Sequence, residues 1–185
     1  MATERGSMAK EKAIYEATYL EVTKKLAKGK KTTKKLPDDP TQSWRTPPDL
    51  FKKLDEIFGF TVDAFANEKN HLLPKWWEDC ESEDWSNEIA FCNPPFGYVD
   101  KFLFRASRAQ MSLWLCMANR LVSPGVNKYP PALLIIPARR LKFIPPDGIQ
   151  AKSPTSGTVL LVYGKVSREQ IARLETIGSI WTSWK

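Results

Sequence analysis

The chain has 185 residues, and 42% of them are hydrophobic, which is enough for one domain with a packed core. Three cysteines without CxxC spacing and a single unsupported histidine argue against a disulfide framework, a metal site and serine–histidine chemistry. There is no apolar run of membrane-spanning length and no signal-peptide centre, so we expect a protein of a reducing, cytoplasmic compartment. The net charge of +7 favours a polyanionic partner, nucleic acid first.

The first 40 residues differ in composition from the rest of the chain. Segment 24–35, KKLAKGKKTTKK, carries seven lysines and no acidic residue. We interpret residues 1–40 as a basic, flexible N-terminal arm and residues 41–185 as one folded domain. Two roles for the arm stay open, namely contact with the phosphates of DNA or a solvated tail.

Strand-like and helix-like segments alternate along the folded part. The first half is expected to hold a helix over 46–58 capped by Thr46 and stopped by Gly59, a strand over 60–66, a short helix and perhaps a short strand between 67 and 88, and a strand over 89–92. A helix over 98–110, a strand over 111–118, a loop over 119–131, a strand over 132–144 broken at Pro137, a loop over 145–157 and a strand over 158–164 should follow. The last helix is capped by Ser167 and Gln170 and carries Ile171, Leu174, Ile177 and Ile180. The alternation predicts an α/β fold with a mostly parallel sheet flanked by helices.

Two polar residues fall at predicted carboxyl ends of strands, Asp63 in FTVDAFA and Asn93 after IAFC. In open α/β sheets, ligands bind beyond the carboxyl ends of strands, where the strand order reverses. We therefore expect Asp63 and Asn93 to share one pocket.

The tetrapeptide Asn93-Pro94-Pro95-Phe96 has the groups needed to bind an amine attached to an aromatic base. The lone pair of such an amine is delocalised into the ring, so acceptors that hold both N–H groups free it for attack. The Asn93 side-chain oxygen can accept one hydrogen bond, and the carbonyl of Pro94 can accept the other from a backbone that proline stiffens. Phe96 offers a flat face for stacking. A simple turn is the alternative.

At this point the chain resembles a known group of enzymes. NPPF is similar to the [DNS]PP[YFW] motif of amino-methyltransferases that use S-adenosylmethionine. The segments WRTP (44–47), FGFTVDAFA (58–66), DW (84–85), CNPPFG (92–97) and RRLKF (139–143) occur in the order seen in phage-encoded DNA N6-adenine methyltransferases, the phage Dam family. The similarity covers about residues 42–164, and it implies a Rossmann-like class I methyltransferase fold.

The resemblance assigns roles to matching positions. Residues implied to bind S-adenosylmethionine are Thr46 and Pro47 at its methionine end, Asp63, Ala64, Phe65 and Ala66 in the first cofactor loop, and Asp84 and Trp85 at its adenine. Asn93, Pro94, Pro95 and Phe96 match the catalytic motif. The acid that holds the ribose stays open among Glu68, Glu78 and Asp79. Where the family carries a glycine two residues after an aromatic, this chain has Phe65 followed by Ala66 and Asn67.

The short chain leaves little room for a separate target-recognition domain. Recognition is then expected from the loops at about 119–131 and 144–157. Arg139, Arg140 and Lys142 beside them are expected to hold DNA phosphates, with ordinary salt bridges as the alternative.

The resemblance implies a site-specific DNA adenine methyltransferase that flips adenine from double-stranded DNA and methylates its N6 amine. If phage-encoded, it acts in the cytoplasm of a bacterial host, and GATC is a target by family analogy alone. Two alternatives remain, an amino-methyltransferase acting on RNA or protein glutamine, and an inactive DNA-binding protein of the same fold.

Overall fold

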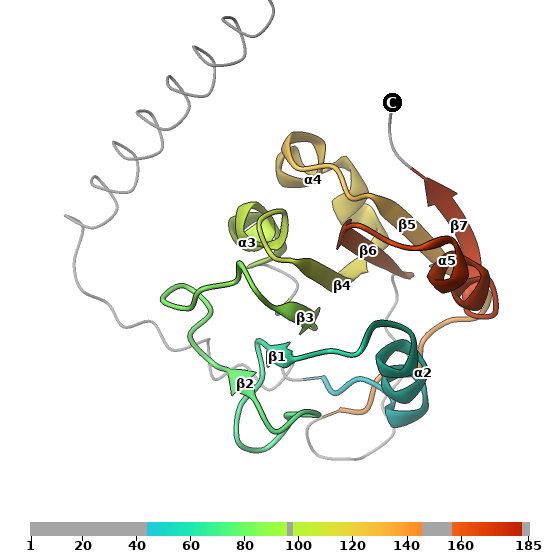
Figure 1. The fold of residues 1–185 in the computed structure, drawn as a ribbon. Coiled ribbons are helices and arrows are strands. Elements are labelled where there is room, and N and C mark those ends of the chain that lie inside the picture. Colours follow the sequence, from blue (N-terminus) through green and yellow to red (C-terminus); the bar gives the residue numbers. More distant parts are fainter. Residues whose placement is uncertain (1–43, 96–97, 146–156, 183–185) are drawn as a thin grey trace, which may run out of the picture. The chain divides into compact units, whose positions relative to one another are not determined.

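The computed structural model describes residues 44–95, 98–145 and 157–182, so the predicted basic arm over residues 1–40 lies outside the described residues. Figure 1 shows helices on both sides of one sheet. The elements are α2 (Pro48–Phe58), β1 (Val62–Ala64), β2 (Trp76–Trp77), β3 (Ile89–Cys92), α3 (Val99–Ala106), β4 (Met111–Met117), the 3₁₀ helix η3 (Ala118–Val122), α4 (Pro124–Lys128), β5 (Leu133–Pro137), β6 (Thr158–Gly164), α5 (Arg168–Leu174) and β7 (Gly178–Thr182).

The seven strands form one mixed sheet in the order β2-β1-β3-β4-β6-β5-β7. Strands β2, β1, β3 and β4 pair in parallel, whereas β6 runs antiparallel to β4 and β5, and β7 runs antiparallel to β5. The predicted α/β fold with a parallel core and flanking helices is thus confirmed. The chain turns to β2 on one side of β1 and to β3 on the other, so the strand order reverses between β1 and β3.

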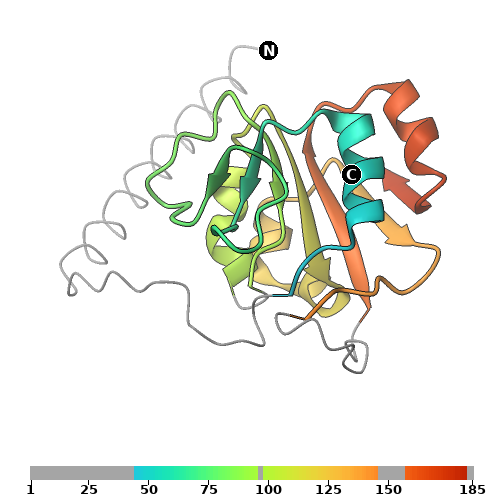
Figure 2. The ribbon, with the colours of Figure 1, turned by 90° about the horizontal axis from the view of Figure 1, so that it is seen from below.

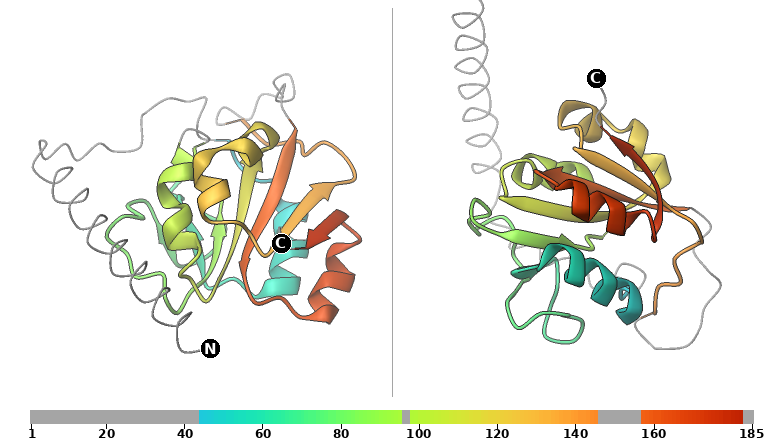
Figure 3. Two further views of the ribbon diagram at one scale, coloured as in Figure 1. Left: turned by 90° about the horizontal axis from the view of Figure 1, so that it is seen from above. Right: turned by 45° about the vertical axis from the view of Figure 1, so that its right-hand side comes forward.

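Each face of the sheet has its own apolar layer. Side chains alternate along a strand, so Trp114 and Cys116 of β4 pack on the face covered by α3, while Leu113 and Leu115 pack on the opposite face. Both views in Figure 3 show α3 and α4 on one face and α2 and α5 on the other. Helix α2 is held by its buried apolar side and ends at Gly59, whose φ of 64° suits glycine.

The helix start and the first strand differ from the sequence prediction. Thr46 is not the cap of α2, because the helix begins at Pro48 with Pro47 as N-cap and no side-chain cap. The proline pair sets the entry angle instead. The predicted strand over 60–66 is reduced to Val62–Ala64, because the chain turns sharply at Phe65.

Two later segments also differ from the prediction. The expected loop over 119–131 contains η3 and α4, and Ser123 caps α4 by accepting from the backbone N–H of Val126. The capping box of Ser167 and Gln170 is confirmed, but α5 ends at Leu174. Ile180 lies instead in β7, since pairing with the open edge of β5 satisfies the backbone of 178–182.

The strands predicted over 89–92, 111–118 and 158–164 correspond to β3, β4 and β6. Of the strand expected over 132–144, only the part up to Pro137 forms β5, and Ile144 makes an isolated bridge instead. The helix expected over 98–110 is confirmed as α3, but it ends at Ala106. Between β1 and β3, where we expected a short helix and perhaps a strand, the structure has the strand β2 and turns.

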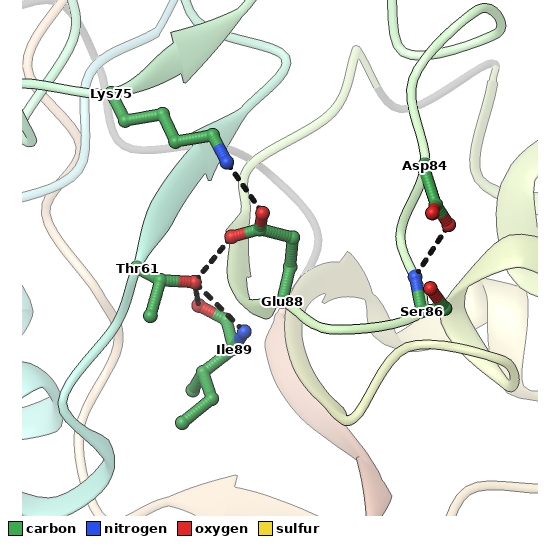
Figure 4. Close-up of polar contacts among 6 residues, drawn as sticks. All are labelled: Thr61, Lys75, Asp84, Ser86, Glu88 and Ile89. Carbon is green, nitrogen blue, oxygen red and sulfur yellow. Dashed lines mark hydrogen bonds and ion pairs between the residues drawn. The ribbon is translucent and has the colours of Figure 1, made fainter.

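The amino ends of the three strands β1, β2 and β3 are tied together by side chains (Figure 4). Glu88 before β3 forms an ion pair with Lys75 before β2 and accepts a 2.5 Å hydrogen bond from the Thr61 hydroxyl before β1. The Thr61 oxygen also accepts from the Ile89 N–H at 2.9 Å. This network joins the segments that lead into the three parallel strands at their amino edge.

Candidate functional site

The carboxyl ends of β1 and β3 lie side by side at the switch in strand order. Ala64 and Cys92, the last residues of the two strands, are register partners. The segments that follow them, beginning with Phe65 and Asn93, therefore start from neighbouring positions. Figure 2 shows this edge at its lower side, where the ends of β3 and β4, residues 44–47 and residues 144–145 come together. This edge, formed by the carboxyl ends of the strands β1, β3 and β4, is the carboxyl rim.

Asn93 is oriented by a contact that sequence reasoning did not find. Its side-chain Nδ2 donates a 2.9 Å hydrogen bond to the backbone carbonyl of Trp44. A carbonyl can only accept, so the amide must present its NH₂ to Trp44 and its Oδ1 elsewhere. None of the described residues donates to Asn93 Oδ1 or to the carbonyl of Pro94, whereas the carbonyl of Pro95 accepts from the N–H of Tyr98 at 2.8 Å. Two acceptors on adjacent residues are thus available, and Phe96 lies outside the described residues.

The segment that holds Asn93 is itself fixed to the rim. Arg45 and Ile144 form a two-residue antiparallel bridge, with N···O distances of 2.8 and 2.9 Å. The next residue, Thr46, is 2% exposed, and its Oγ1 has no hydrogen-bond partner within the described ranges. Buried hydroxyl groups are normally satisfied, so this unpaired hydroxyl, on the segment that holds Asn93, is a candidate partner for a polar ligand atom.

Asp63 lies in the middle of β1 and points to the face opposite Val62 and Ala64. It is 4% exposed, and its Oδ2 accepts a 2.7 Å hydrogen bond from the backbone N–H of Leu72. Burial raises the pKa of Asp63 to about 6, against the lowering effect of the Leu72 hydrogen bond. One oxygen of this carboxylate orders the loop after β1, and the described residues offer no hydrogen bond to the other.

Phe65 makes the turn after β1 in a conformation that side chains rarely adopt. Its φ is 66°, the only positive φ of a non-glycine residue in the described chain. The turn is held by its backbone N–H, which lies 3.2 Å from the sulfur of Cys80, and by the N–H of Ala66, which donates to the carbonyl of Trp77. The Phe65 ring is buried and packs edge-on against Phe102 with centroids 4.9 Å apart. The strained turn is therefore maintained by burial of its side chain.

A family model described as DNA N-6-adenine-methyltransferase (Dam) matches residues 32–122. The chain belongs to this family. The match includes WRTP, FTVDAFA, DW and CNPPFG, and it ends before RRLKF. The comparison with curated proteins found no match, and neither did the comparison with solved structures.

In this Dam-family chain the glycine expected after the aromatic residue is absent, and the structure shows how the turn forms without it. Asn67 stands at the position of that glycine and has no positive φ, whereas Phe65, two residues earlier, adopts a left-handed conformation. The cost of placing a side chain there is of the order of 1–2 kcal/mol. Burial of a whole aromatic ring is worth more than this, so the departure leaves the loop after β1 in place.

Asp84 and Trp85 are not joined to Asn93 or Asp63 by any described contact. Asp84 is exposed, and its Oδ1 accepts a 3.0 Å hydrogen bond from the Ser86 N–H, which lowers the pKa of Asp84 (Figure 4). Trp85 is 3% exposed, stacks on Trp114, and donates its indole N–H to the carbonyl of Cys80. The surroundings of Trp85 are those of a core residue, and its contact with a cofactor stays a prediction.

The three acids considered for the ribose differ in their surroundings. Glu78 is exposed and directly follows Trp77 at the carboxyl end of β2, the strand beside β1. Asp79 is engaged in its own turn, where it accepts hydrogen bonds from the Glu81 N–H and from the Ser82 hydroxyl. Glu68 is exposed in the loop after β1. Of these three acids, Glu78 is the one that directly follows the carboxyl end of a strand.

The basic residues after β5 line a groove of about 660 Å³. Arg139, Arg140 and Lys142 are all exposed, and Lys53 of α2 faces the same groove, which sequence reasoning had missed. Pro47, next to Thr46 in sequence, lines it as well, so the groove adjoins the carboxyl rim. Four cations and one carboxylate, that of Asp49, give this surface a net positive charge.

None of the helices in the described ranges is long and apolar enough to cross a membrane. Within those same ranges, no group of three or more histidine, cysteine and acidic side chains could hold a metal ion. All three cysteines are free and buried, and burial raises the pKa of the Cys80 thiol to about 12.

Proposed function

We propose that this chain transfers a methyl group from S-adenosylmethionine to the N6 amine of adenine in double-stranded DNA, with Asn93 and Pro94 as the acceptors that hold the amine. The observation that carries the proposal is the hydrogen bond from Asn93 Nδ2 to the Trp44 carbonyl. It leaves Oδ1 as an acceptor at the switch in strand order, beside the equally available carbonyl of Pro94.

This pair of acceptors suits an exocyclic amine because such an amine has two N–H groups. Holding both N–H groups in fixed directions favours an amine nitrogen whose lone pair is localised on nitrogen rather than delocalised into the ring, so that it can attack the methyl carbon. The Trp44 tether and the two prolines make the acceptors rigid before the substrate arrives, so little reorganisation is needed during the reaction. Once N6 has accepted the methyl group, the cationic nitrogen loses one of its protons to water. Stacking on Phe96 stays part of the proposal.

The residues around the rim fit S-adenosylmethionine. The Oγ1 of Thr46, two residues from the Trp44 carbonyl that holds Asn93, and the second oxygen of Asp63 in β1 are polar atoms without partners among the described residues. Asp63 would order the cofactor loop or accept from the cofactor's amino group, and we favour Glu78 for the ribose hydroxyls because it begins at the end of β2. When bound, the cofactor supplies an electrophilic methyl group on a sulfonium sulfur.

DNA would follow the basic groove next to the rim. Arg139, Arg140, Lys142 and Lys53 present their charges along one surface that begins at Pro47. Such contacts neutralise phosphates, position the duplex and carry no sequence information, so the target sequence would be read by other groups.

The proposal is tested by incubating the full chain with methyl-labelled S-adenosylmethionine and, in parallel, duplex DNA of varied sequence, structured RNA and a mixture of proteins. We expect label in N6-methyladenine of the duplex. Label in RNA or protein alone would replace the DNA substrate by one of the alternatives. Calorimetric binding of S-adenosylmethionine without transfer to any acceptor would indicate a binding protein that has lost activity.

A further inference from the structure

Three buried side-chain atoms in the described chain have no hydrogen-bond partner: Arg45 Nε, Thr46 Oγ1 and Arg120 Nε. Arg45 and Thr46 belong to the segment that holds Asn93. Arg120 comes from η3, directly after β4, which is the strand next to β3. Unsatisfied buried polar groups are rare in folded proteins, and here all three lie on segments that leave for the same edge of the sheet.

Arg120 is the one that sequence reasoning did not connect with any function. In β4, Trp114 is the register partner of Cys92, the last residue before Asn93, and β4 continues from there to Met117 before η3 begins. Arg120 is half-buried. Its positive charge lowers the pKa of the nearby Cys116 thiol, although burial of that thiol raises the same pKa by more. The described chain gives its guanidinium neither a hydrogen bond nor an ion pair.

The backbone around Arg120 is fixed. The carbonyl of Arg120 accepts from the Ser123 N–H at 2.9 Å, and the Ser123 hydroxyl is 2.5 Å from Asp100 of α3. Asp100 also stands so close to Gly125 that a Cβ on Gly125 would lie 2.7 Å from its carboxylate oxygen. Asp100 is thus committed to holding η3 and α4 against α3, and Arg120 is presented by a rigid support with its charge uncompensated.

We propose that Arg120 binds a phosphate of the DNA strand that carries the target adenine. A guanidinium has a planar fork of donors that matches phosphate oxygens, and a half-buried unpaired Nε gains most from such a partner. The strand order indicates which ligand Arg120 would meet. The pocket proposed for the cofactor lies between the ends of β1 and β3. Arg120 follows β4 on the other side of β3, where the target base would have to enter. The inference rests on the proposed function, since it concerns the same substrate.

The experiment compares Arg120→Ala and Arg120→Lys with Arg168→Ala. Arg168 is an exposed arginine at the start of α5, which follows β6 at the opposite edge of the sheet, because Gly164 pairs with the first residue of β4. Affinity for a short duplex is measured by fluorescence anisotropy over a salt series, S-adenosylmethionine affinity by calorimetry, and folding by thermal melts.

We expect Arg120→Ala to weaken duplex binding about tenfold and to reduce the slope of log affinity against log salt by about one. Arg120→Lys should restore the slope and only part of the affinity, because the ammonium keeps the charge and loses the planar fork. Cofactor affinity should not change. The control should bind DNA within about twofold of the wild type, since its charge faces bulk solvent.

The inference is overturned if Arg120→Ala behaves like Arg168→Ala, or if it loses cofactor affinity and thermal stability together with DNA affinity while Arg120→Lys restores none of them. Methyl transfer by the wild-type chain is measured alongside. Transfer to DNA by the wild type with no effect at Arg120 refutes this inference alone, whereas no transfer to DNA by the wild type refutes the proposed function.

Discussion

Replacing Asn93 by alanine separates the two tasks that the structure gives to this side chain. The amide donates one 2.9 Å hydrogen bond to Trp44 and, in the proposed mechanism, accepts another from the substrate amine. Loss of a half-buried hydrogen bond of the first kind costs about 0.5–1.5 kcal/mol. For a folded region of this size, that lowers the melting temperature by only a few degrees, roughly 2–4 °C per kcal/mol, so Asn93→Ala should fold.

The second task carries the larger effect. Removing one preorganised hydrogen-bonding group from a reacting centre typically lowers kcat by about 10²–10³, or roughly 2.7–4 kcal/mol. We therefore expect kcat of Asn93→Ala to fall at least a hundredfold while the affinity for S-adenosylmethionine stays near that of the wild type. Asn93→Asp keeps an acceptor but loses the donor to Trp44, so its activity should lie between the two.

The assay measures initial rates of label transfer into duplex DNA at saturating cofactor, with cofactor affinity determined separately by calorimetry. Asn87→Ala is the matched control, because Asn87 is an exposed asparagine before the amino end of β3, whereas Asn93 follows its carboxyl end. A loss of kcat below tenfold in Asn93→Ala would refute the catalytic role. Equal losses of turnover and cofactor affinity would make Asn93 a structural residue.

Three further predictions concern the groove, the buried acid and the strained turn. Lys53→Ala should weaken duplex binding severalfold and lower its salt dependence. Lys52 is the exposed neighbour outside the groove, so Lys52→Ala should change neither quantity. Equal fluorescence anisotropy results for the two variants would exclude the groove as the path of the DNA. The pKa of Asp63 is raised from 3.8 to about 6, so the folded state binds its proton more tightly, and this contribution to stability is complete below about pH 4 and lost as pH rises through 6. Asp63→Asn should therefore be more stable than the wild type at pH 8, by at most about 3 kcal/mol, with the difference vanishing near pH 4 in urea titrations; a pH-independent difference would contradict the burial argument. Both Phe65→Gly and Phe65→Ala lose the buried ring, but glycine relieves the strained φ, so the glycine variant should be about 1 kcal/mol more stable in the same titrations, and the opposite order would show that the turn is unstrained.

Local patterns in the chain were sufficient for most elements and for the motif. IAFC is a strand because its residues suit a buried, extended backbone, and Gly59 ends α2 because it takes a left-handed φ. The position of Asn93 after β3 could be predicted in the same way, since a strand and the turn after it are read from neighbouring residues. The parallel core followed from the alternation of helices and strands.

Long-range pairing decided the rest. No local signal shows that 178–182 would leave a helical pattern to pair with β5, that Trp44 would orient Asn93 from 49 positions away, or that Lys53 would face Arg139 across a groove. The left-handed turn at Phe65 is equally invisible in sequence, because phenylalanine rarely adopts a positive φ and only burial of its ring makes that conformation tolerable. The sequence by itself determined the family, the α/β alternation and the catalytic motif, since these depend on residues close together in the chain. The tertiary structure decided which atoms of that motif bond within the protein, as Asn93 Nδ2 does with Trp44, because that depends on contacts between segments distant in sequence.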